Sequence, residues 1–396
     1  MEVNINGMDY INDLGRKNFK TLFTPIQIGK VIIPNRLFWP PWCFNWANTD
    51  GTMSGKMADF YLDLADGGCG LIITGCAAVS PDSLLYERSM KIYHKDHVPG
   101  LKKLCAEIKK RGSIPGIQLM NFGRQSITTF TGKELYAPSN IPCPVKSKKD
   151  PNYRLREMTL EDIERVKNDY INAAILSTEA GVDVIQLHAA HGFLLNQFLS
   201  PYTNKRNDQY GGNTENRVRF ILEVIKGIRA KIGNAAAIDV RVSADELVEG
   251  GLKPNDYKEI IPLFEAAGVD MINVSISISE TTGLAFRQKL EPQGRHAWIA
   301  KKLKTYTSSG VKIAHACFIA NLEVAQRVMI ENNIDMIGLG RAQFADPHII
   351  KKTLEGREDE INRCAWDNSC LFSFSNNGNE VFCLVNPKYQ KPKICN

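Results

Sequence analysis

The chain has 396 residues, of which 43% are hydrophobic and 23% charged, and it contains 30 glycines and 18 prolines. These are the values of a globular protein, so they exclude a disordered, collagen-like or coiled-coil chain. Its 49 basic and 43 acidic side chains leave a net charge of +6, which is mild for this length. Because no aromatic-studded basic motif accompanies that charge, we expect no nucleic-acid binding.

Short runs rich in β-branched residues recur along the chain, and amphipathic segments separate most of them. The predicted strands are 36–40, 71–74, 116–119, 182–188, 238–242, 271–275, 311–314 and 336–340. The predicted helices are 57–67, 98–111, 160–180, 214–232, 255–267, 296–305 and 322–332. Apolar strands that alternate with helices indicate a parallel sheet buried on both faces. Eight such units without a change of composition favour a closed (β/α)8 TIM barrel over an open doubly wound sheet.

Two segments are longer than the alternation of strands and helices requires. Residues 120–159, between the third strand and the next helix, are rich in Pro, Ser, Lys and Thr. A long loop at the carboxyl end of a barrel strand is usually a lid or a substrate-binding insertion. The second segment is a cysteine-containing tail. We therefore expect a barrel domain over residues 1–355 and a C-terminal tail over residues 356–396.

Targeting and redox signals point to the cell interior. The chain has no run of about 18 apolar residues, so we expect no membrane span, and residues 1–17 lack the apolar core of a signal peptide. Ten cysteines without a secretion signal indicate a reducing compartment, where thiols serve as core residues, ligands or catalysts. We expect a cytoplasmic protein.

Polar side chains stand at the carboxyl ends of several predicted strands, which meet at one face of a barrel. A glutamine, an arginine and paired histidines at these ends suit a planar heterocycle with hydrogen-bonding edges. Small residues after the last two strands, Ala316, Gly338 and Gly340, permit the close approach of a phosphate. The pattern predicts a phosphate-bearing cofactor at the mouth of the barrel.

Several segments resemble signatures of the old yellow enzyme family of FMN-dependent oxidoreductases. They are LFTPIQIGKVIIPNR (22–36), GLIITG (70–75), QLMNFGR (118–124), HAAHGFLLNQFLSPYTNKRNDQYGG (188–212), ENR (215–217) and RVSAD (241–245). The resemblance covers essentially the whole chain and is nearest to the branch of 2,4-dienoyl-CoA reductase and trimethylamine dehydrogenase. It implies the same barrel, FMN as the cofactor and NAD(P)H as the electron donor. We expect no FAD- or NAD-binding domain after the tail, so a separate electron-donor protein is the alternative to NAD(P)H.

The resemblance also implies roles for individual residues. Gln118 would bond the pyrimidine edge of the flavin, and Arg241 would lie near N1 and O2 and stabilise the anionic reduced flavin. His188 and His191 match the catalytic pair that holds the substrate carbonyl oxygen. The other cofactor-binding candidates line the ring, namely Pro41, Cys43 and Cys76, or hold the phosphate, namely Ala316, Cys317, Gly340 and Arg341.

This sequence departs from the family pattern near the substrate. Phe193 stands where many members carry the tyrosine that protonates the substrate carbon, and a phenyl ring cannot donate a proton. Another residue or a water molecule must then donate this proton. Asn121 stands where a histidine is usual. Of three crowded tryptophans, Trp39, Trp42 and Trp46, which either pack on the barrel or form an aromatic wall, we place Trp42 with Phe193 in the substrate pocket.

The tail carries an altered iron–sulfur pattern. Cys364, Cys370 and Cys383 fit the C-x2-C-x2-C-x12-C spacing of the dienoyl-CoA reductase branch, but Asp367 occupies the second position. A carboxylate is a harder ligand than the thiolates that such clusters prefer. The sequence leaves open whether these residues hold a [4Fe–4S] or [3Fe–4S] cluster or form a relic segment that packs on the barrel.

Three functions remain in view. The leading one is an ene-reductase, a homo-oligomer that transfers hydride from reduced FMN to the activated C=C of a small α,β-unsaturated carbonyl compound. The first alternative is an amine dehydrogenase or demethylase of the trimethylamine dehydrogenase type, with an aromatic cage for the cation. The second is a non-catalytic flavin electron-transfer subunit, which Phe193 and Asp367 would favour. The histidine pair favours the ene-reductase, because imidazoles suit a carbonyl oxygen better than an ammonium group.

Overall fold

The computed structural model describes residues 18–285, 293–308, 310–372 and 380–390. The strands are β1 (Ile26–Ile28), β2 (Val31–Ile33), β3 (Leu37–Trp39), β4 (Leu71–Ala78), β5 (Met90–Lys91), β6 (Ile114–Met120), β7 (Leu135–Ala137), β8 (Leu155–Glu157), β9 (Val184–Ala189), β10 (Ala237–Ser243), β11 (Met271–Ser275), β12 (Lys312–His315) and β13 (Met336–Gly338). The α-helices are α2 (Gly55–Asp66), α3 (Val98–Lys110), α4 (Thr128–Thr131), α5 (Pro144–Ser147), α6 (Leu160–Glu179), α7 (Leu194–Leu199), α8 (Thr214–Ile232), α9 (Tyr257–Ala267), α10 (Thr282–Ala285), α11 (Ala297–Lys304), α12 (Leu322–Glu331), α13 (Gly340–Ala345), α14 (Ile349–Leu354) and α15 (Ser369–Phe372). Short 3-10 helices are η1 (Lys95–His97), η2 (Gly123–Gln125), η3 (Ser279–Thr281), η4 (Glu358–Glu360) and η6 (Pro387–Tyr389).

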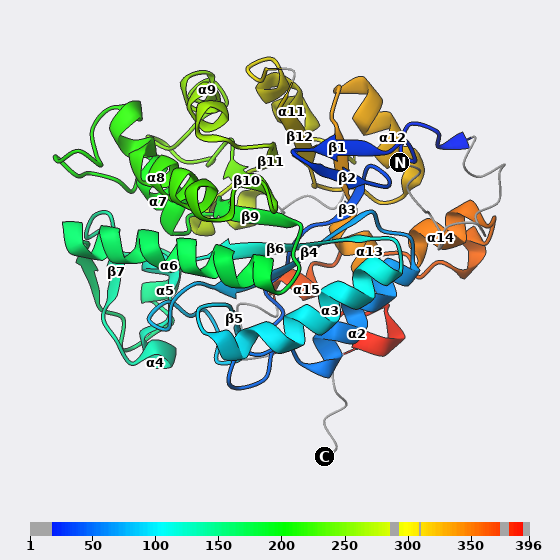
Figure 1. Ribbon diagram of the computed structural model, residues 1–396, viewed down its shortest axis with the longest axis horizontal. Coiled ribbons are helices and arrows are strands. Elements are labelled where there is room, and N and C mark those ends of the chain that lie inside the picture. Colours follow the sequence, from blue (N-terminus) through cyan, green and yellow to red (C-terminus); the bar gives the residue numbers. More distant parts are fainter. Residues whose placement is uncertain (1–17, 286–292, 309, 373–379, 391–396) are drawn as a thin grey trace.

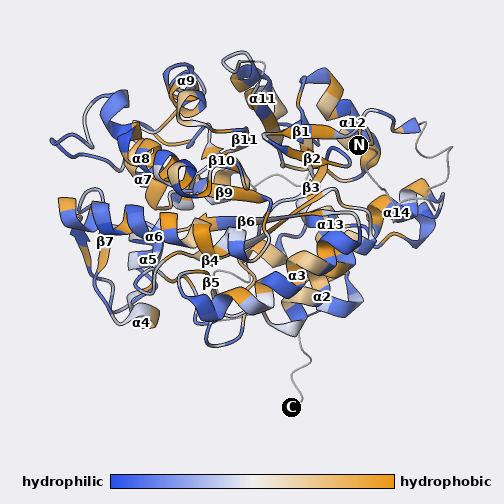
Figure 2. Cartoon of the chain, viewed as in Figure 1, coloured by the Kyte–Doolittle hydropathy of each residue, from blue (hydrophilic) through white to orange (hydrophobic). Residues whose placement is uncertain are grey.

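Eight parallel strands close into a barrel, in the order β3-β13-β12-β11-β10-β9-β6-β4, and β4 pairs with β3 to complete the ring. The short β5 adds to β4 outside the ring. In Figure 1 the strands lie between α9, α11 and α12 on one side and α2, α3 and α6 on the other. These helices mix hydrophilic and hydrophobic residues along their length (Figure 2), as helices that cover a sheet with one face do. The predicted (β/α)8 barrel is confirmed.

A hairpin closes the amino-terminal end of the barrel. Its strands β1 and β2 pair antiparallel, with Ile26 opposite Ile33. Ile26, Ile28 and Ile33 pack against apolar side chains inside the barrel, among them Phe38, Leu71 and Val184. The sequence did not predict this hairpin, because its two strands have three residues each. With that end filled, only the carboxyl end of the barrel is left to form a site.

The long insertion after β6 is present and ordered. It contains η2, α4, α5 and the parallel pair β7–β8, in which Leu135 lies opposite Leu155. Arg124 fastens it to the barrel, because the guanidinium donates to the carbonyl oxygens of Ile141 (3.5 Å) and Pro142 (3.1 Å). The same side chain pairs with Glu280 of η3 at 2.5 Å.

The described part of the tail packs against the barrel. The Trp46 indole donates to the carbonyl oxygen of Val381 at 3.1 Å, and Asn386 donates to that of Phe344 at 2.8 Å. Lys388 forms an ion pair with Asp63 of α2 at 2.7 Å. Within the described ranges, none of the helices is both long and apolar enough to span a membrane.

Candidate active site

A cavity of about 470 Å³ opens at the carboxyl end of the barrel. Its wall is built from the ends of the barrel strands, from the insertion and from the tail. The predicted cofactor-binding, catalytic and substrate-pocket residues all lie on this wall: Pro41, Trp42, Cys43, Cys76, Gln118, His188, His191, Phe193, Arg241, Ala316, Cys317, Gly340 and Arg341. The fold thus brings together thirteen side chains that span 300 positions of the sequence, from 41 to 341.

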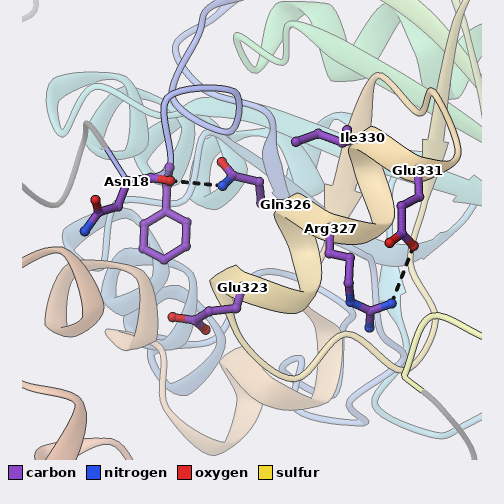
Figure 3. A pocket seen from close by; sticks show the side chains of 7 residues that line it. Asn18, Glu323, Gln326, Arg327, Ile330 and Glu331 are labelled. Atoms are coloured by element: carbon purple, nitrogen blue, oxygen red, sulfur yellow. Dashed lines mark hydrogen bonds and ion pairs between the residues drawn. The ribbon is translucent and has the colours of Figure 1, made fainter.

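A second hollow lies on the outer surface of α12 and is shown in Figure 3. Gln326 donates there to the carbonyl oxygen of Asn18 at 2.9 Å, and Arg327 pairs with Glu331 at 3.6 Å. Among the described residues that line it, none is a histidine or a cysteine. The described lining of this surface hollow therefore lacks the histidine pair that distinguishes the barrel mouth.

The histidine pair stands at the end of β9. His188 lies on the strand, and His191 follows in a turn with φ +59°, a left-handed conformation that non-glycine residues seldom adopt. Two hydrogen bonds hold this turn: the His191 backbone N–H donates to Ser243 Oγ (2.8 Å), and Gln125 Nε2 donates to the His191 carbonyl oxygen (2.7 Å). Strain supported in this way is frequent at functional sites.

The two imidazole rings are almost perpendicular, with centroids 5.0 Å apart. His191 Nδ1 lies 3.3 Å from His188 Nε2, and His191 Nε2 lies 2.7 Å from Ser275 Oγ. Burial lowers the pKa of both histidines well below 6.5, and the nearby Arg241 cation lowers both further. Both rings are therefore neutral at physiological pH, and each has one N–H to donate and one nitrogen that can accept.

A buried polar chain crosses the barrel below the histidines. Gln118 Nε2 donates to Gln186 Oε1 at 2.6 Å, and Gln186 Nε2 donates to Asp239 at 2.5 Å. Burial raises the pKa of Asp239 to about 7. In the described part of the chain, Gln118 Oε1 and Arg241 Nε have no hydrogen-bond partner. Leaving such atoms unsatisfied is costly, so they call for a ligand.

These unsatisfied atoms fit FMN. The pyrimidine edge of a flavin alternates carbonyl oxygens with an N–H, so it can donate to Gln118 Oε1 and accept from Arg241. Burial lowers the pKa of Arg241 to about 10, which keeps the guanidinium protonated at neutral pH. A fixed positive charge there suits the negative charge that a reduced flavin carries.

Gly338 and Gly340 line the other end of the cavity, where a phosphate could approach the backbone closely. A Cβ at Gly338 would lie 2.7 Å from the Cβ of Ala316 and 2.9 Å from the ring of Phe38, so no side chain fits. Gly340 begins α13, whose first-turn N–H groups have no intrahelical partner. Together with Arg341, these groups form a cradle that suits a phosphate.

The tail completes this end. The Arg341 guanidinium lies against the rings of Phe318 and Trp366, 4.6 and 4.4 Å from their centroids, and the two rings stack on each other at 5.9 Å. Arg341 Nη1 also donates to Asn368 Oδ1 at 2.5 Å. The sequence was interpreted there only for its cysteines, so Trp366 and Asn368 were missed. Ser275 was missed too, although its place at the end of a predicted strand could have revealed it.

The crowded tryptophans divide between the two predicted interpretations. Trp39 and Trp46 are buried and pack with Phe44, whereas Trp42 lines the cavity. Asn121 lies outside the wall and supports the loop after β6. Its Oδ1 accepts from Ser83 and from the Gly123 backbone N–H, and its Nδ2 donates to Tyr136.

Cys43 and Cys76 line the cavity, as predicted from the resemblance, but they form a disulfide. The expectation that the cysteines are thiols is therefore wrong for this pair. Cys43 follows β3 and Cys76 lies within β4, the neighbouring strand of the barrel, and their Cα atoms are 5.0 Å apart. That separation lies within the range that a disulfide requires. The described cysteines outside a disulfide are Cys69, Cys105, Cys143, Cys317, Cys364, Cys370 and Cys383.

The tail cysteines do not assemble a metal site in the part of the chain that is described. No three His, Cys, Asp or Glu side chains gather there in a metal-binding arrangement. Asp367 accepts a hydrogen bond from the Ser369 backbone N–H at 2.6 Å, and Cys364 Sγ accepts from that of Trp366 at 3.4 Å. Three thiols and one carboxylate do not supply the four thiolates of a [4Fe–4S] cluster, and a [3Fe–4S] cluster on the three cysteines stays a prediction.

Comparison with known proteins identifies the family. The NADH:flavin oxidoreductase / NADH oxidase family model matches residues 21–360. The NADH oxidase of Thermoanaerobacter brockii is 34% identical over 379 residues, which cover 93% of this chain and 56% of that protein. The NADPH dehydrogenase of Bacillus velezensis is 32% identical over 351 residues, 86% of this chain and 96% of that protein. A solved 2-naphthoyl-CoA reductase complex superposes with a TM-score of 0.86 and 29% identity, covering 93% of this chain and 57% of that one.

A closed barrel with a cavity that fits FMN defines a flavin-binding oxidoreductase. The chain belongs to the NADH:flavin oxidoreductase / NADH oxidase family. The predicted membership of the old yellow enzyme group, and the enzyme class of FMN-dependent oxidoreductases, are confirmed at the level of the family. The chain spans about half the length of some of its relatives, 56% in the case of the NADH oxidase.

Proposed function

We propose that this chain is an FMN-dependent ene-reductase that reduces the activated C=C of an α,β-unsaturated carbonyl compound with electrons from NAD(P)H. FMN would supply the hydride when bound. Gln118 and Arg241 would hold its pyrimidine edge, and Gly340 and Arg341 its phosphate. Residues 1–355 would form the FMN-binding domain, and the tail from residue 356 would support Arg341 through Trp366.

The observation that carries this proposal is the neutral histidine pair on a wall whose described residues include no carboxylate. A substrate carbonyl oxygen that took the place of the contact between His191 Nδ1 and His188 Nε2 could accept an N–H from each ring. Such hydrogen bonds would draw electron density from the conjugated alkene and favour hydride addition at its far carbon. The cationic side chains of the wall are Lys146, Lys149, Arg241 and Arg341, and among the described lining residues none is Asp or Glu. Such a wall repels an ammonium group, so it disfavours the amine dehydrogenase alternative.

Protonation of the second alkene carbon needs a different donor from that of many relatives. The Phe193 ring lines the cavity with its centroid 5.0 Å from that of His188, but it has no proton to give. Other groups of the wall carry hydroxyls, among them Ser277, Ser279 and Thr282. We propose that one of these hydroxyls, or water in the cavity, delivers the proton.

Phenol binding tests the role of the histidines. A phenol whose oxygen is held by His188 and His191 should stack on the oxidised flavin and produce a long-wavelength charge-transfer band. The His188→Ala/His191→Ala variant should lose the band and keep FMN. His315→Gln is the control, because His315 is buried outside the cavity wall. Loss of FMN together with the band would instead mean that the pair supports the cofactor, which would contradict the proposal.

A further inference from the structure

Two lysines of the insertion, Lys146 and Lys149, line the same cavity as the histidine pair. The other two cations of the wall, Arg241 and Arg341, have places at the two ends of the cofactor in the proposed function. The described lining contains no carboxylate, and no described Asp or Glu forms an ion pair with Lys146. Lys146 is therefore a cation of the described wall that FMN binding does not account for.

The helix that carries Lys146 is fixed in place by hydrogen bonds at its start. The backbone N–H of Cys143, the residue before α5, donates to the Tyr153 hydroxyl oxygen at 3.1 Å. That hydroxyl donates to the carbonyl oxygen of Arg124 at 2.8 Å. The Arg124 side chain in turn binds the backbone just before Cys143 and pairs with Glu280. Lys146 is thus presented from a braced segment.

This bracing places α5 on the histidine side of the cavity. The helix packs against η3, which contains Glu280. The residue before η3, Ile278, forms a β-bridge with His191. Lys146 therefore projects from a segment joined through η3 to the turn that holds His191. The phosphate cradle lies instead after β12 and β13.

Burial makes the ammonium of Lys146 expensive to keep charged. Its pKa is lowered from 10.5, chiefly by desolvation and then by the neighbouring Lys149 charge. A bound anion would relieve both effects, because it pairs with the ammonium and offsets the repulsion between the lysines. A partly buried cation without an ion pair in a ligand cavity is therefore suited to contribute to anion binding.

We propose that Lys146, with Lys149 beside it, binds an anionic group of the substrate, a carboxylate or a phosphate, so that the enzyme selects unsaturated carbonyl compounds that carry a negative charge away from the alkene. This inference rests on the proposed function, in which the histidines hold the carbonyl oxygen. Lys146 and Lys149 would act in specificity, and neither would take part in hydride or proton transfer.

Ligand binding to the oxidised holoenzyme tests this without turnover. Three phenols share one flavin-stacking group: 4-hydroxybenzoate carries a carboxylate, 4-hydroxybenzoyl-CoA carries phosphates, and methyl 4-hydroxybenzoate is neutral. Their dissociation constants are measured from the charge-transfer band in wild type and in Lys146→Gln, Lys149→Gln and Lys146→Arg. The matched control is Lys148→Gln, which removes a charge from the same segment but lies outside the wall.

We expect wild type to bind at least one anionic phenol roughly 10- to 100-fold more tightly than the ester, the range of a charge-assisted hydrogen bond. Lys146→Gln should abolish the preference, Lys149→Gln should weaken it, and Lys146→Arg and Lys148→Gln should keep it. The phenol that binds more tightly than the ester shows whether the lysines bind a carboxylate or a phosphate. Equal affinity for acid, thioester and ester, or a preference that survives Lys146→Gln, would overturn the inference and leave the ene-reductase proposal standing. A charge-transfer band with none of the phenols would overturn the histidine role itself.

The FMN content of each variant, measured after denaturation, checks that the fold is intact. If Lys146→Gln fails to fold, Lys149→Gln gives the decisive comparison, because Lys149 is exposed and its replacement leaves the packing of α5 unchanged. A wild-type preference that Lys149→Gln leaves at full strength would then count against the lysine pair.

Discussion

The ring of Phe193 determines which group can protonate the reduced alkene, and Phe193→Tyr is the most informative single change. Phe193 is the N-cap residue of α7, two positions after His191, and it packs edge-on against Phe122 at 5.5 Å. It is partly exposed and lines the cavity. The variant would add a proton-donating hydroxyl to a ring that already faces the substrate space. We expect faster turnover of simple cyclic enones.

The size of the effect follows from what a general acid contributes. A positioned acid accelerates a step by about 10²- to 10⁴-fold, which corresponds to about 3 to 5 kcal/mol of barrier. If water already donates the proton in wild type, the increase in rate from the new hydroxyl falls toward roughly tenfold. Because the ring borders a cavity, the new hydroxyl can reach water, so the free energy of unfolding should change by less than about 0.5 kcal/mol.

Stopped-flow absorbance separates the two half-reactions of the flavin. Phe193→Tyr should speed reoxidation of the reduced flavin by an enone and leave its reduction by NAD(P)H unchanged within about twofold. Phe318→Tyr, which adds the same hydroxyl at the Arg341 end of the cavity, should change neither rate. If wild type already reduces simple enones rapidly and Phe193→Tyr adds nothing, the reasoning about a missing acid is refuted.

Three further changes test the cradle, the insertion and a buried histidine. Gly338→Ala places a Cβ 2.7 Å from that of Ala316, so FMN titration of the apoprotein should show at least roughly tenfold weaker binding, and unchanged affinity would disprove the cradle. Arg124→Met leaves Glu280 without its partner, so denaturant unfolding should show a loss of about 3–5 kcal/mol, with faster proteolysis within residues 127–157; equal resistance would show that Arg124 does not brace the insertion. Burial lowers the pKa of His315 from 6.5 to about 4, so the unfolded chain binds this proton first and wild type should lose up to about 3 kcal/mol as pH falls from 6.5 to 4. His315→Gln should show a correspondingly smaller loss across that window, and parallel pH profiles would contradict the assignment.

The barrel was predictable because its strands carry a strong local signal. The residues of β4, from Leu71 to Ala78, are all buried and none of them is charged, and such runs repeat between amphipathic helices. The hairpin β1–β2 and the pair β7–β8 carry little signal, because each strand has only three residues. Their strands are specified by contacts with the rest of the fold and by pairing across a loop.

The wall of the site was predictable where residues end a barrel strand, as for Gln118, His188 and Arg241. Residues that reach the cavity from the tail or from the insertion were not predictable. Trp366 meets Phe318 only when the tail folds back on the barrel, and Lys146 is one of several lysines in the insertion, among which the sequence does not distinguish it. The disulfide was missed for the same reason, because Cys43 and Cys76 become neighbours only when β3 and β4 pair.

Anaerobic reoxidation of the reduced flavin tests the proposed function most directly. The purified protein is reduced with light or NAD(P)H, freed of excess donor, and mixed with enones, enoates and enoyl thioesters while the flavin absorbance is recorded. An ene-reductase predicts that at least one of these alkenes restores the oxidised flavin spectrum and yields the saturated product in equal amount. A flavin that stays reduced with every alkene, while the oxidised protein is bleached by a secondary or tertiary amine, would contradict it.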